Sequence, residues 1–178
     1  MREDGHWESV PLGDLFAIVG GGTPSTGEAT YWGHGTPWVS SADVDAWMQL
    51  HPRREVAQAG LDASPCRAVP PGSVVVVTRV GLGKVGLAAE PVCFSQDCHA
   101  LLPTEGVEPR FVAFQMSTAA SRFRSMARGT TIPGITKRQL AEVGFHLPPT
   151  AEQHRIVAKL DDLFSELDAG VAALDRAQ

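Results

Sequence analysis

GTTIPGITKRQLAEVGFHLPPTAEQ fills residues 129–153, and a helical pattern continues from there to the C-terminus. Thr136 and Gln139 match a capping box, in which two side chains satisfy the free backbone N–H groups at the start of a helix. We therefore expect a short helix over 137–143, followed by a short strand over 145–147. The double proline that comes next separates this strand from the last helix.

The last helix begins with a second such pair, Thr150 and Gln153, and is predicted to run for about 25 residues, or roughly 37 Å. Gly170 interrupts it and costs ~1 kcal/mol relative to alanine, so we expect this helix to need a partner. Its apolar residues recur every three or four positions and share one face. The residues expected to face the partner are Ile156, Leu160, Leu163, Phe164, Leu167, Val171 and Leu174. The alternative is a helix that folds back on its own domain.

Length and composition indicate one globular domain with an appended element. The chain has 178 residues, a net charge of −5 and 43% apolar residues, which is ordinary for a globular protein. Its longest apolar stretch is too short to span a bilayer, and its polar N-terminus lacks a signal-peptide core. Three cysteines, Cys66, Cys93 and Cys98, suit a reducing compartment better than a disulfide framework. We therefore expect a cytoplasmic protein without a membrane partner.

The charge is distributed unevenly along the chain. Residues 63–141 contain nine Lys and Arg against four Asp and Glu, whereas the remainder is strongly acidic. A basic region attracts phosphate groups even in an acidic protein, because the local field governs binding. This pattern favours a phosphate-binding surface, and chance clustering explains it equally well when charge is considered alone.

Irregularly alternating strand-like and helical segments predict an α+β fold. The clearest strand covers 73–79, and Gly81-Leu-Gly83 predicts a turn that pairs it with 84–88 as a hairpin. Pro109 suits the first turn of a helix, which we expect to end at a C-terminal cap on Gly129. The expected architecture is a twisted mixed or antiparallel sheet with peripheral helices, followed by the long C-terminal helix.

Residues 20–24, Gly-Gly-Gly-Thr-Pro, cannot form regular structure and predict a loop. Tyr31, Trp32 and Trp38 follow closely, and such large side chains are expected to pin the loop down. The loop lacks the Gly-Lys-Ser/Thr ending of a nucleotide phosphate loop. Its backbone N–H groups can still hold a DNA phosphate or shape a binding edge.

Other motifs do not support catalysis. Residues 81–86 match the dinucleotide-binding glycine pattern, but Pro91 follows too soon for the helix that this site requires. Cys93, Cys98 and His99 lack a fourth ligand at zinc-site spacing. Cys98 and His99 would also point to opposite faces of a strand, which excludes a Cys–His nucleophile. We expect no metal, no cofactor and no catalytic residue, so a binding module is favoured over a nucleotide-dependent enzyme.

A series of short motifs in one order resembles one half of the DNA specificity subunit of type I restriction-modification enzymes. The series covers nearly the whole chain, and its most specific members are Gly21-Gly-Thr-Pro-Ser25 and Leu147-Pro-Pro149 with Glu152-Gln153. The other members are Trp7, Leu12-Gly-Asp14, Tyr31-Trp-Gly33, Pro37-Trp-Val39, Ala42-Asp-Val44, Pro71-Gly72, Gly83-Lys-Val85, Ser95-Gln-Asp97, Gly129-Thr-Thr131, Ile135-Thr136, Leu140 and Ile156-Val157.

This resemblance implies a target-recognition domain over 1–149 and a spacer or dimerisation helix over 150–178. In the family, each recognition domain reads one half of a split site on double-stranded DNA, and the helices set the distance between the halves. Methyltransferase subunits, and restriction subunits with them, assemble around the specificity subunit and carry the chemistry. The usual subunit has two such halves, so a second half or a second copy is expected to pair with the last helix.

Base reading needs polar side chains on loops, and phosphate contacts fix the register. On this basis the resemblance points to nine residues with DNA-binding roles, with Gln96 reading an adenine edge and Lys137 and Arg138 on phosphate. The nine are Thr23, Ser25, Arg79, Lys84, Gln96, Thr130, Thr131, Lys137 and Arg138. The alternative function is a helix-mediated assembly or decoy protein that does not read DNA itself.

Overall fold

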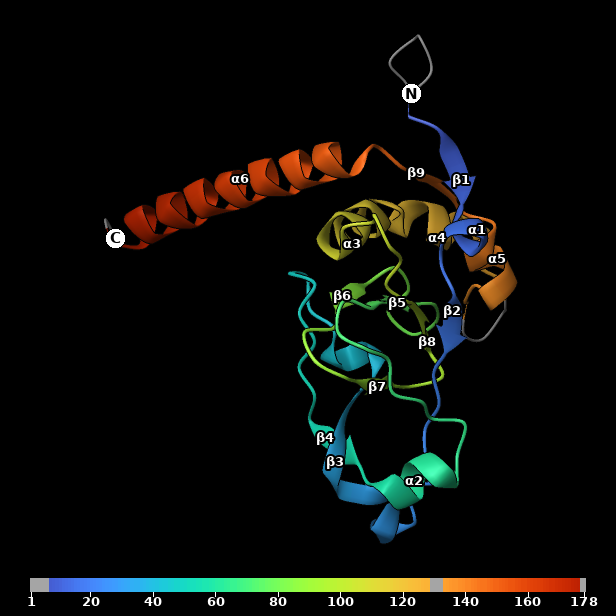
Figure 1. Cartoon of the computed structure of the whole chain (residues 1–178). Helices are drawn as coiled ribbons and strands as arrows, with labels where there is room; N and C mark the ends of the chain where they lie inside the picture. The colour runs from blue at the N-terminus through green and yellow to red at the C-terminus, as the bar shows by residue number, and fades with distance from the viewer. Residues whose placement is uncertain (1–6, 129–132, 177–178) are drawn as a thin grey trace.

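The computed structural model describes residues 7–128 and 133–176 and centres on a four-stranded sheet (Figure 1). The strands are antiparallel and lie in the order β2-β8-β5-β6. Their bounds are β2 Ile18–Gly20, β8 Cys98–Leu101, β5 Val74–Val77 and β6 Val85–Leu87. The predicted hairpin is confirmed, because β5 pairs with β6 from Val74 opposite Leu87 to Val76 opposite Val85.

All four valines of β5 are buried. Alternate side chains of a strand point to opposite faces, so a fully buried strand needs cover on both. Val74 and Val76 pack in one core cluster with Phe111 of helix α3. Val75 and Val77 belong to a second cluster on the other face. The sequence of β5 is therefore apolar at every position, instead of alternating between apolar and polar residues.

Two smaller sheets complete the β structure, and their mixture of pairings confirms the predicted α+β class. In the order β4-β3-β7, strand β3 is antiparallel to β4 and parallel to β7, while β1 pairs antiparallel with β9. The strands are β3 Trp32–Val39, β4 Arg54–Val56, β7 Cys93–Phe94, β1 Ser9–Pro11 and β9 Gly144–His146. Short helical turns connect them: α1 Leu12–Leu15, η1 Ala29–Tyr31, η2 Ser41–Asp43 and α2 Gln58–Asp62.

Two helices, α3 Pro109–Thr118 and α4 Ala120–Met126, stand where one continuous helix was predicted. The break lies beside the turn between β5 and β6. A Cβ placed on Gly83 of this turn would lie only 2.7 Å from the Cβ of Ala120, the first residue of α4. Figure 1 shows both helices above the central sheet. The start at Pro109 is confirmed, and the expected cap at Gly129 lies outside the described residues.

The first predicted capping box is confirmed at helix α5, Lys137–Ala141. The backbone N–H of Gln139 donates to the Thr136 hydroxyl at 3.2 Å, and the backbone N–H of Thr136 donates to Oε1 of Gln139 at 2.9 Å. The side-chain amide of Gln139 also donates to the carbonyl of Met126 at 3.1 Å. This last bond fastens α5 to the end of α4.

The second predicted capping box is wrong, because Gln153 has a different role. Its side chain is buried, with Oε1 accepting from the backbone N–H of Glu108 at 2.8 Å. Its amide donates to the carbonyls of Pro148 at 2.9 Å and Gly106 at 3.3 Å. The Thr150 hydroxyl also donates to Gly106, at 2.8 Å. These bonds tie the last helix to the loop before α3 instead of closing its own first turn.

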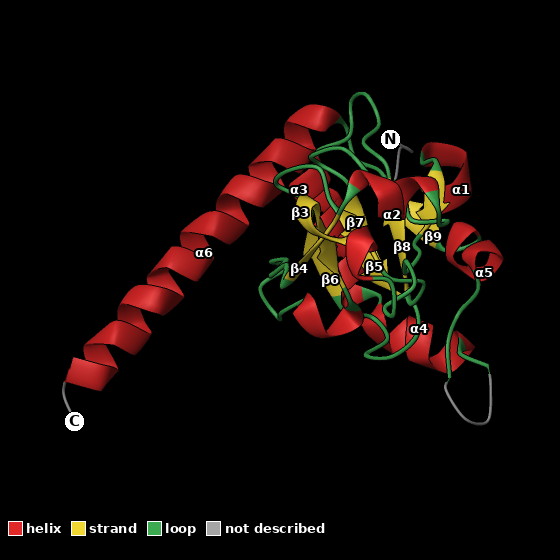
Figure 2. Ribbon diagram, turned by 90° about the horizontal axis from the view of Figure 1, so that it is seen from below, coloured by secondary structure: helices red, strands yellow, loops and turns green. Residues whose placement is uncertain are grey.

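Helix α6, Thr150–Arg176, has 27 residues and projects from the rounded body of the protein (Figures 1 and 2). Its first turns pack on the domain: Val157 is buried, and Ile156 contacts the main core cluster. Ile156, predicted to face a partner, is therefore partly in contact with its own domain. The alternative of a helix that folds back on its own domain describes α6 as far as Phe164, because the middle of the helix also contacts the domain.

Two contacts fix the middle of α6. Arg110 of α3 forms a two-pronged ion pair with Asp161. The ring of Phe164 stacks on Phe114 with centroids 5.9 Å apart and meets the edge of Trp47 at 5.9 Å. The apolar residues beyond Phe164 are exposed, with Leu167 55%, Val171 50% and Leu174 67% exposed.

The glycine loop sits directly against the connection between β7 and β8. A Cβ on Gly21 would lie 2.2 Å from the carbonyl oxygen of Ser95, so no other residue fits there without movement. The backbone N–H of Gly22 donates to the Phe94 carbonyl at 2.8 Å. The indole N–H of Trp38 donates to the Gly22 carbonyl at 3.0 Å, which confirms that an aromatic side chain pins this loop.

Gly21→Ala is expected to lower the free energy of unfolding by at least about 3 kcal/mol, because the added methyl group meets backbone atoms that cannot move freely. The matched control is Gly27→Ala, whose Cβ would meet only the Ser25 hydroxyl, at 4.0 Å. Urea unfolding followed by circular dichroism measures both variants. Equal stabilities for the two would contradict the close approach at Gly21.

Gln153→Ala should cost about 2–4 kcal/mol, because it removes three hydrogen bonds and leaves buried backbone groups without partners. Lys159→Ala, at an exposed position on the same helix, is the control and should stay near the unmodified protein. The unfolding midpoint in urea gives the comparison. A Gln153→Ala protein as stable as the control would show that these bonds do not anchor α6.

Candidate nucleic-acid interface

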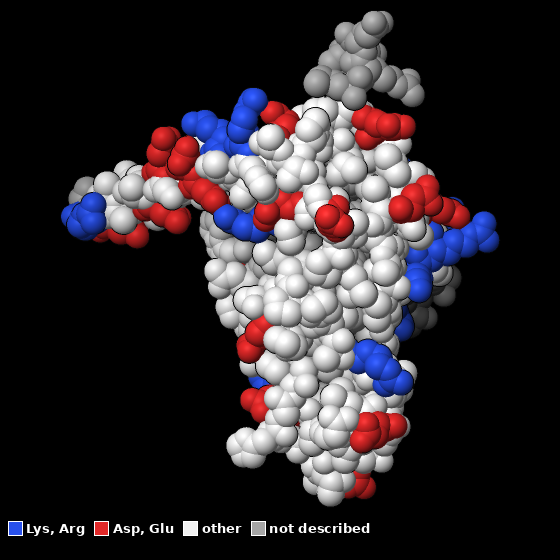
Figure 3. Space-filling model, viewed as in Figure 1, with Lys and Arg blue, Asp and Glu red and all other residues white. Residues whose placement is uncertain are grey.

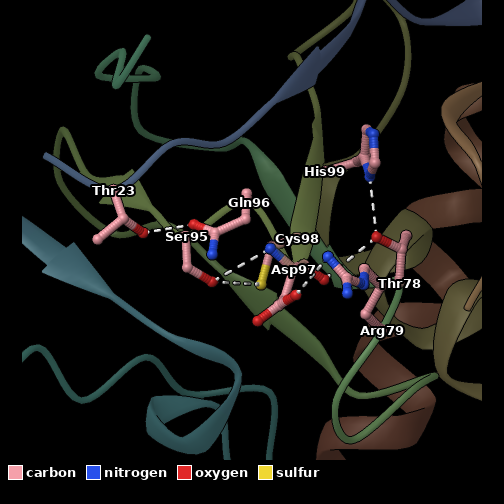
Figure 4. A network of polar contacts seen from close by, with 8 residues as sticks. All are labelled: Thr23, Thr78, Arg79, Ser95, Gln96, Asp97, Cys98 and His99. Atoms are coloured by element: carbon pink, nitrogen blue, oxygen red, sulfur yellow. Dashed lines mark hydrogen bonds and ion pairs between the residues drawn. The ribbon is translucent and has the colours of Figure 1, made fainter. Parts of the chain in front are cut away.

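The central sheet presents polar side chains at the edge where β5 ends and β8 begins. Thr78 and Arg79 follow β5, and their backbone N–H groups donate to the carbonyl of Asp97 at 2.8 and 3.2 Å. The guanidinium of Arg79 also approaches the Asp97 carboxylate, with Nη1 to Oδ1 at 3.4 Å (Figure 4). Asp97, in the turn before β8, therefore orients the guanidinium of Arg79, whose side chain is still 44% exposed.

Thr23 and Gln96, both predicted to bind DNA, meet at this edge although 73 residues separate them in sequence. The Thr23 hydroxyl donates to Oε1 of Gln96 at 2.5 Å (Figure 4). Gln96 is exposed, so this bond orients an amide that solvent can still reach. On the same loop, the indole N–H of Trp32 donates to the carbonyl of Ser25 at 3.0 Å, which holds the exposed Ser25 in place.

His99 lies beside this group and contributes no charge at neutral pH. Its Nδ1 is 2.9 Å from the Thr78 hydroxyl (Figure 4). Burial lowers the pKa of His99, and the nearby positive charge of Lys137 lowers it further. The imidazole is therefore predominantly neutral at pH 7.

A third chain segment brings further positive charge to the edge. The N–H of Ile135 donates to the Thr78 carbonyl at 2.9 Å, and a Cβ on Gly134 would lie 2.7 Å from Cγ of Arg79. Gly134 also exchanges two backbone hydrogen bonds with Arg128, each 3.0 Å long. Arg79, Arg128 and Lys137 thus gather from three separate parts of the sequence. We call these three residues together with Thr23 and Gln96 the polar edge.

The remaining predicted DNA-binding residues have other environments. The Lys84 ammonium donates to the carbonyl of Ser41 at 3.3 Å, and Arg138 pairs with Glu142 at 2.9 Å on the exposed side of α5. Both cations are exposed, but each is already partly satisfied within the protein. Thr130 and Thr131 lie outside the described residues.

Sequence reasoning missed three residues at this edge. Asp97 belongs to a quoted motif but was given no role, His99 was considered only as a zinc ligand or as the base of a Cys–His pair, and Arg128 was counted only as charge. No local sequence signal identifies them, because the backbone bridge between Arg128 and Gly134 and the turn at Asp97 are tertiary contacts. The basic character of the middle of the chain was the one available hint.

The charged groups are segregated on the surface. Figure 3 shows Lys and Arg on the side of the domain where Figure 1 places α5, while acidic groups line much of α6. This arrangement offers cationic groups and a directed amide to an anionic ligand, and the amide can both donate and accept hydrogen bonds.

Two of the three buried thiols, Cys93 and Cys98, stay protonated at neutral pH, whereas the hydrogen bond with Cys93 lowers the pKa of Cys66. Burial raises the pKa of Cys98 to about 12, and a hydrogen bond with Cys66 together with burial raises the pKa of Cys93. A thiol in this state is a poor nucleophile at neutral pH. Among the described residues, no three His, Cys, Asp or Glu side chains are grouped closely enough to hold a metal ion. No helix in the described ranges combines the length and apolar character needed to cross a membrane.

Comparison with known proteins gives matches over most of the chain. The specificity subunit of the type I restriction enzyme MjaIX from Methanocaldococcus jannaschii is 27% identical over 165 residues, which cover 88% of this chain and 38% of that protein. The EcoR124I/EcoR124II specificity subunit of Escherichia coli is 26% identical over 166 residues, which cover 89% and 41%. The chain thus spans about two fifths of the length of these curated relatives.

Solved structures show the same architecture. The HsdS subunit from Thermoanaerobacter tengcongensis aligns with a TM-score of 0.73 and 27% identity, covering 98% of this chain and 40% of that one. A chain from a study of complex assembly and conformational transition in a type I R-M system aligns with a TM-score of 0.76 and 29% identity, covering 98% and 41%. Residues 5–173 match the family model described as Type I restriction modification DNA specificity domain. The resemblance found in the sequence is therefore confirmed, and the chain belongs to the family of type I restriction-modification DNA specificity domains.

Proposed function

We propose that this chain reads one half of a split double-stranded DNA target for a type I restriction-modification system. The proposal is supported by the polar edge, where the hydrogen-bonded amide of Gln96 and Arg79, the ion-pair partner of Asp97, meet at one short segment of a chain of this family. Its partners would be the methyltransferase subunit and, through it, the restriction subunit. Methyl transfer and cleavage would take place on those partners, with this chain supplying no catalytic group.

The polar edge suits the division of labour found in DNA recognition. Contacts to phosphates hold the protein in register, and contacts to base edges carry the sequence information. Arg79 and Lys137 are exposed and are assigned to phosphates, as is Arg128. Gln96 is assigned to a base, because an amide that donates and accepts can match the N6 and N7 positions of adenine.

The Thr23 hydroxyl supports this assignment of Gln96. It donates to Oε1 of Gln96, which leaves the NH₂ group without a competing protein acceptor among the described contacts. An oriented side chain loses less conformational entropy on binding than a free one. Reading by Gln96 would therefore depend on Thr23 even if Thr23 itself never touches DNA.

The proposed division of the chain follows from the two environments of α6. Residues 1–149 would form the recognition domain, and 150–178 would form the spacer helix that joins a second recognition unit. The exposed apolar residues from Leu163 onward support this role, since isolated apolar stripes of this kind mark interaction sites. The proposed site of action is the cytoplasm, where the chromosome is methylated.

The proposal is tested by selection from a pool of random DNA duplexes, using the chain together with a type I methyltransferase subunit. Enrichment of a short sequence motif is the expected result. Bound DNA without any enriched motif would contradict sequence recognition. If the chain instead prevents the methyltransferase from binding DNA, the alternative of a decoy protein is correct.

Arg79→Ala and Lys137→Ala should each weaken binding to any duplex, because each removes one proposed phosphate contact. The slope of log affinity against log salt concentration should fall by about 1 for each variant. Arg176→Ala, an equal charge change near the far end of α6, is the matched control and should keep the slope. Fluorescence anisotropy over a range of salt concentrations makes the measurement. An unchanged slope in both edge variants would remove these residues from the interface.

Gln96→Ala should reduce discrimination at one base pair by about 1–3 kcal/mol while leaving non-specific affinity nearly unchanged. Thr23→Val keeps the shape of the side chain but removes its hydroxyl, so it should cause a smaller loss at the same base pair. Competition between the selected duplex and its single-base variants measures both effects. Loss of affinity for every sequence alike would show that Gln96 contacts the DNA backbone instead.

A further inference from the structure

The exposed part of α6 carries an apolar stripe that the domain does not cover. Leu163 is 47% exposed, Leu167 55%, Val171 50% and Leu174 67%. These residues repeat at three- and four-residue spacing, so they lie along one face of the helix. Apolar residues at such spacing commonly pack against a second helix.

Acidic residues flank this stripe. From residue 160 to residue 176 the helix holds five carboxylates and one arginine. The carboxylates belong to Asp161, Asp162, Glu166, Asp168 and Asp175. Only Asp161 has an ion-pair partner within the described part of the chain, and the other four lack one. A helix that covers the stripe must therefore lie within reach of several uncompensated negative charges.

These charges disfavour a second copy of the same chain as the partner. Two copies would bring two strongly acidic segments together whichever way the helices run. In an antiparallel pair centred on Leu167, Glu166 of each copy would lie next to Asp168 of the other. Like charges held side by side destabilise a helix pair and serve to exclude wrong partners.

A hollow beside the stripe fits a cationic side chain. It has a volume of about 720 Å³, and its walls include Trp47, Phe164, Asp168 and the ion pair of Arg110 with Asp161, whose opposite charges offset each other. The indole of Trp47 is 57% exposed, and the Asp168 carboxylate lies on the opposite element. Lysine and arginine bind favourably to the face of an aromatic ring, and the carboxylate supplies an ion pair to the same group.

We propose that the exposed half of α6 docks a helix of opposite charge, with an apolar stripe edged by Lys and Arg, in preference to a second copy of this chain. One basic side chain of that helix enters the hollow between Trp47 and Asp168. This inference rests on the proposed assembly role of α6, and it names the chemistry of the partner in that role. It makes no use of the polar edge, so DNA binding is measured independently of it.

Two labelled peptides of 27 residues test the proposal against the full chain by fluorescence anisotropy. One copies α6, Thr150–Arg176. The other has the same sequence with Asp161→Lys, Asp162→Lys, Glu166→Lys, Asp168→Lys and Asp175→Lys. Both keep the same apolar stripe and differ only in the charge along its edges. The charge-reversed peptide should bind at least about tenfold more tightly, and the difference should shrink at high salt.

Variants of the full chain locate the binding. Asp168→Asn and Trp47→Ala should each weaken binding of the charge-reversed peptide about three- to tenfold. The first variant removes the negative charge of the hollow, and the second removes its aromatic ring. Leu167→Asp, at an exposed position that does not endanger folding, should abolish binding of both peptides. Arg176→Ala serves as the control and should bind the charge-reversed peptide as the unmodified chain does. Circular dichroism confirms that every variant stays folded.

Equal affinities for the two peptides, tighter binding of the native α6 copy, or binding of neither would each overturn the proposal. Sedimentation of the chain alone gives a second check: a monomer is expected at neutral pH, and a stable dimer would identify a second copy as the partner. The Leu167→Asp variant should keep the DNA affinity of the unmodified chain. The failure of this inference is thereby separated from the failure of DNA recognition.

Discussion

The short connection 94–98 between β7 and β8 holds the candidate interface together. The glycine loop bonds to it through Gly21 and Gly22, and the end of β5 bonds to it through the Asp97 carbonyl. The backbone N–H of Ser95 donates to Val39 of β3 at 2.9 Å, which joins two sheets at the same place. Five residues thus determine where a loop, a strand end and an arginine side chain lie relative to one another. Backbone hydrogen bonds supply the rigidity that DNA reading requires. Only the outermost side-chain atoms remain free to contact the ligand.

Helix α6 divides into two parts with opposite requirements. Gln153 and Val157 are buried in the domain, so the direction of the helix is fixed at its base. The ion pair of Arg110 with Asp161 raises the pKa of the arginine and lowers the pKa of the carboxyl, so both groups stay charged through the neutral range. Beyond Phe164 the apolar stripe is exposed and acidic at its edges. A helix that is fixed at its base and exposes an apolar stripe at its far end is suited to holding another protein at a defined distance from the DNA-reading edge.

Local sequence signals predicted the features that depend on neighbouring residues. Four valines in succession gave β5, two glycines gave the hairpin turn, and the Thr136–Gln139 pair gave the start of α5. The same logic failed at Thr150 and Gln153, which match a capping pattern equally well. There a buried amide found better partners in a loop more than forty residues away, so a tertiary contact replaced the local one.

The composition of the polar edge was predictable only in part. Thr23, Arg79, Gln96 and Lys137 were identified through the family resemblance, but nothing in their spacing showed that they converge. Asp97, Arg128 and the contact of Thr78 with His99 depend on how three segments pack. Periodicity and turn chemistry describe one segment at a time, whereas this edge is built from several. The stripe on α6 was easier to predict, because a single helix carries it.

Hydrogen exchange of the chain with and without its selected duplex tests the central claim most directly. Binding should slow amide exchange in 21–25, 78–82, 95–99 and 133–138, the segments that form or adjoin the polar edge. The exposed half of α6, from Leu163 to Arg176, should exchange at the same rate with and without DNA. Slowed exchange confined to α6 would contradict the account and place the DNA on another face.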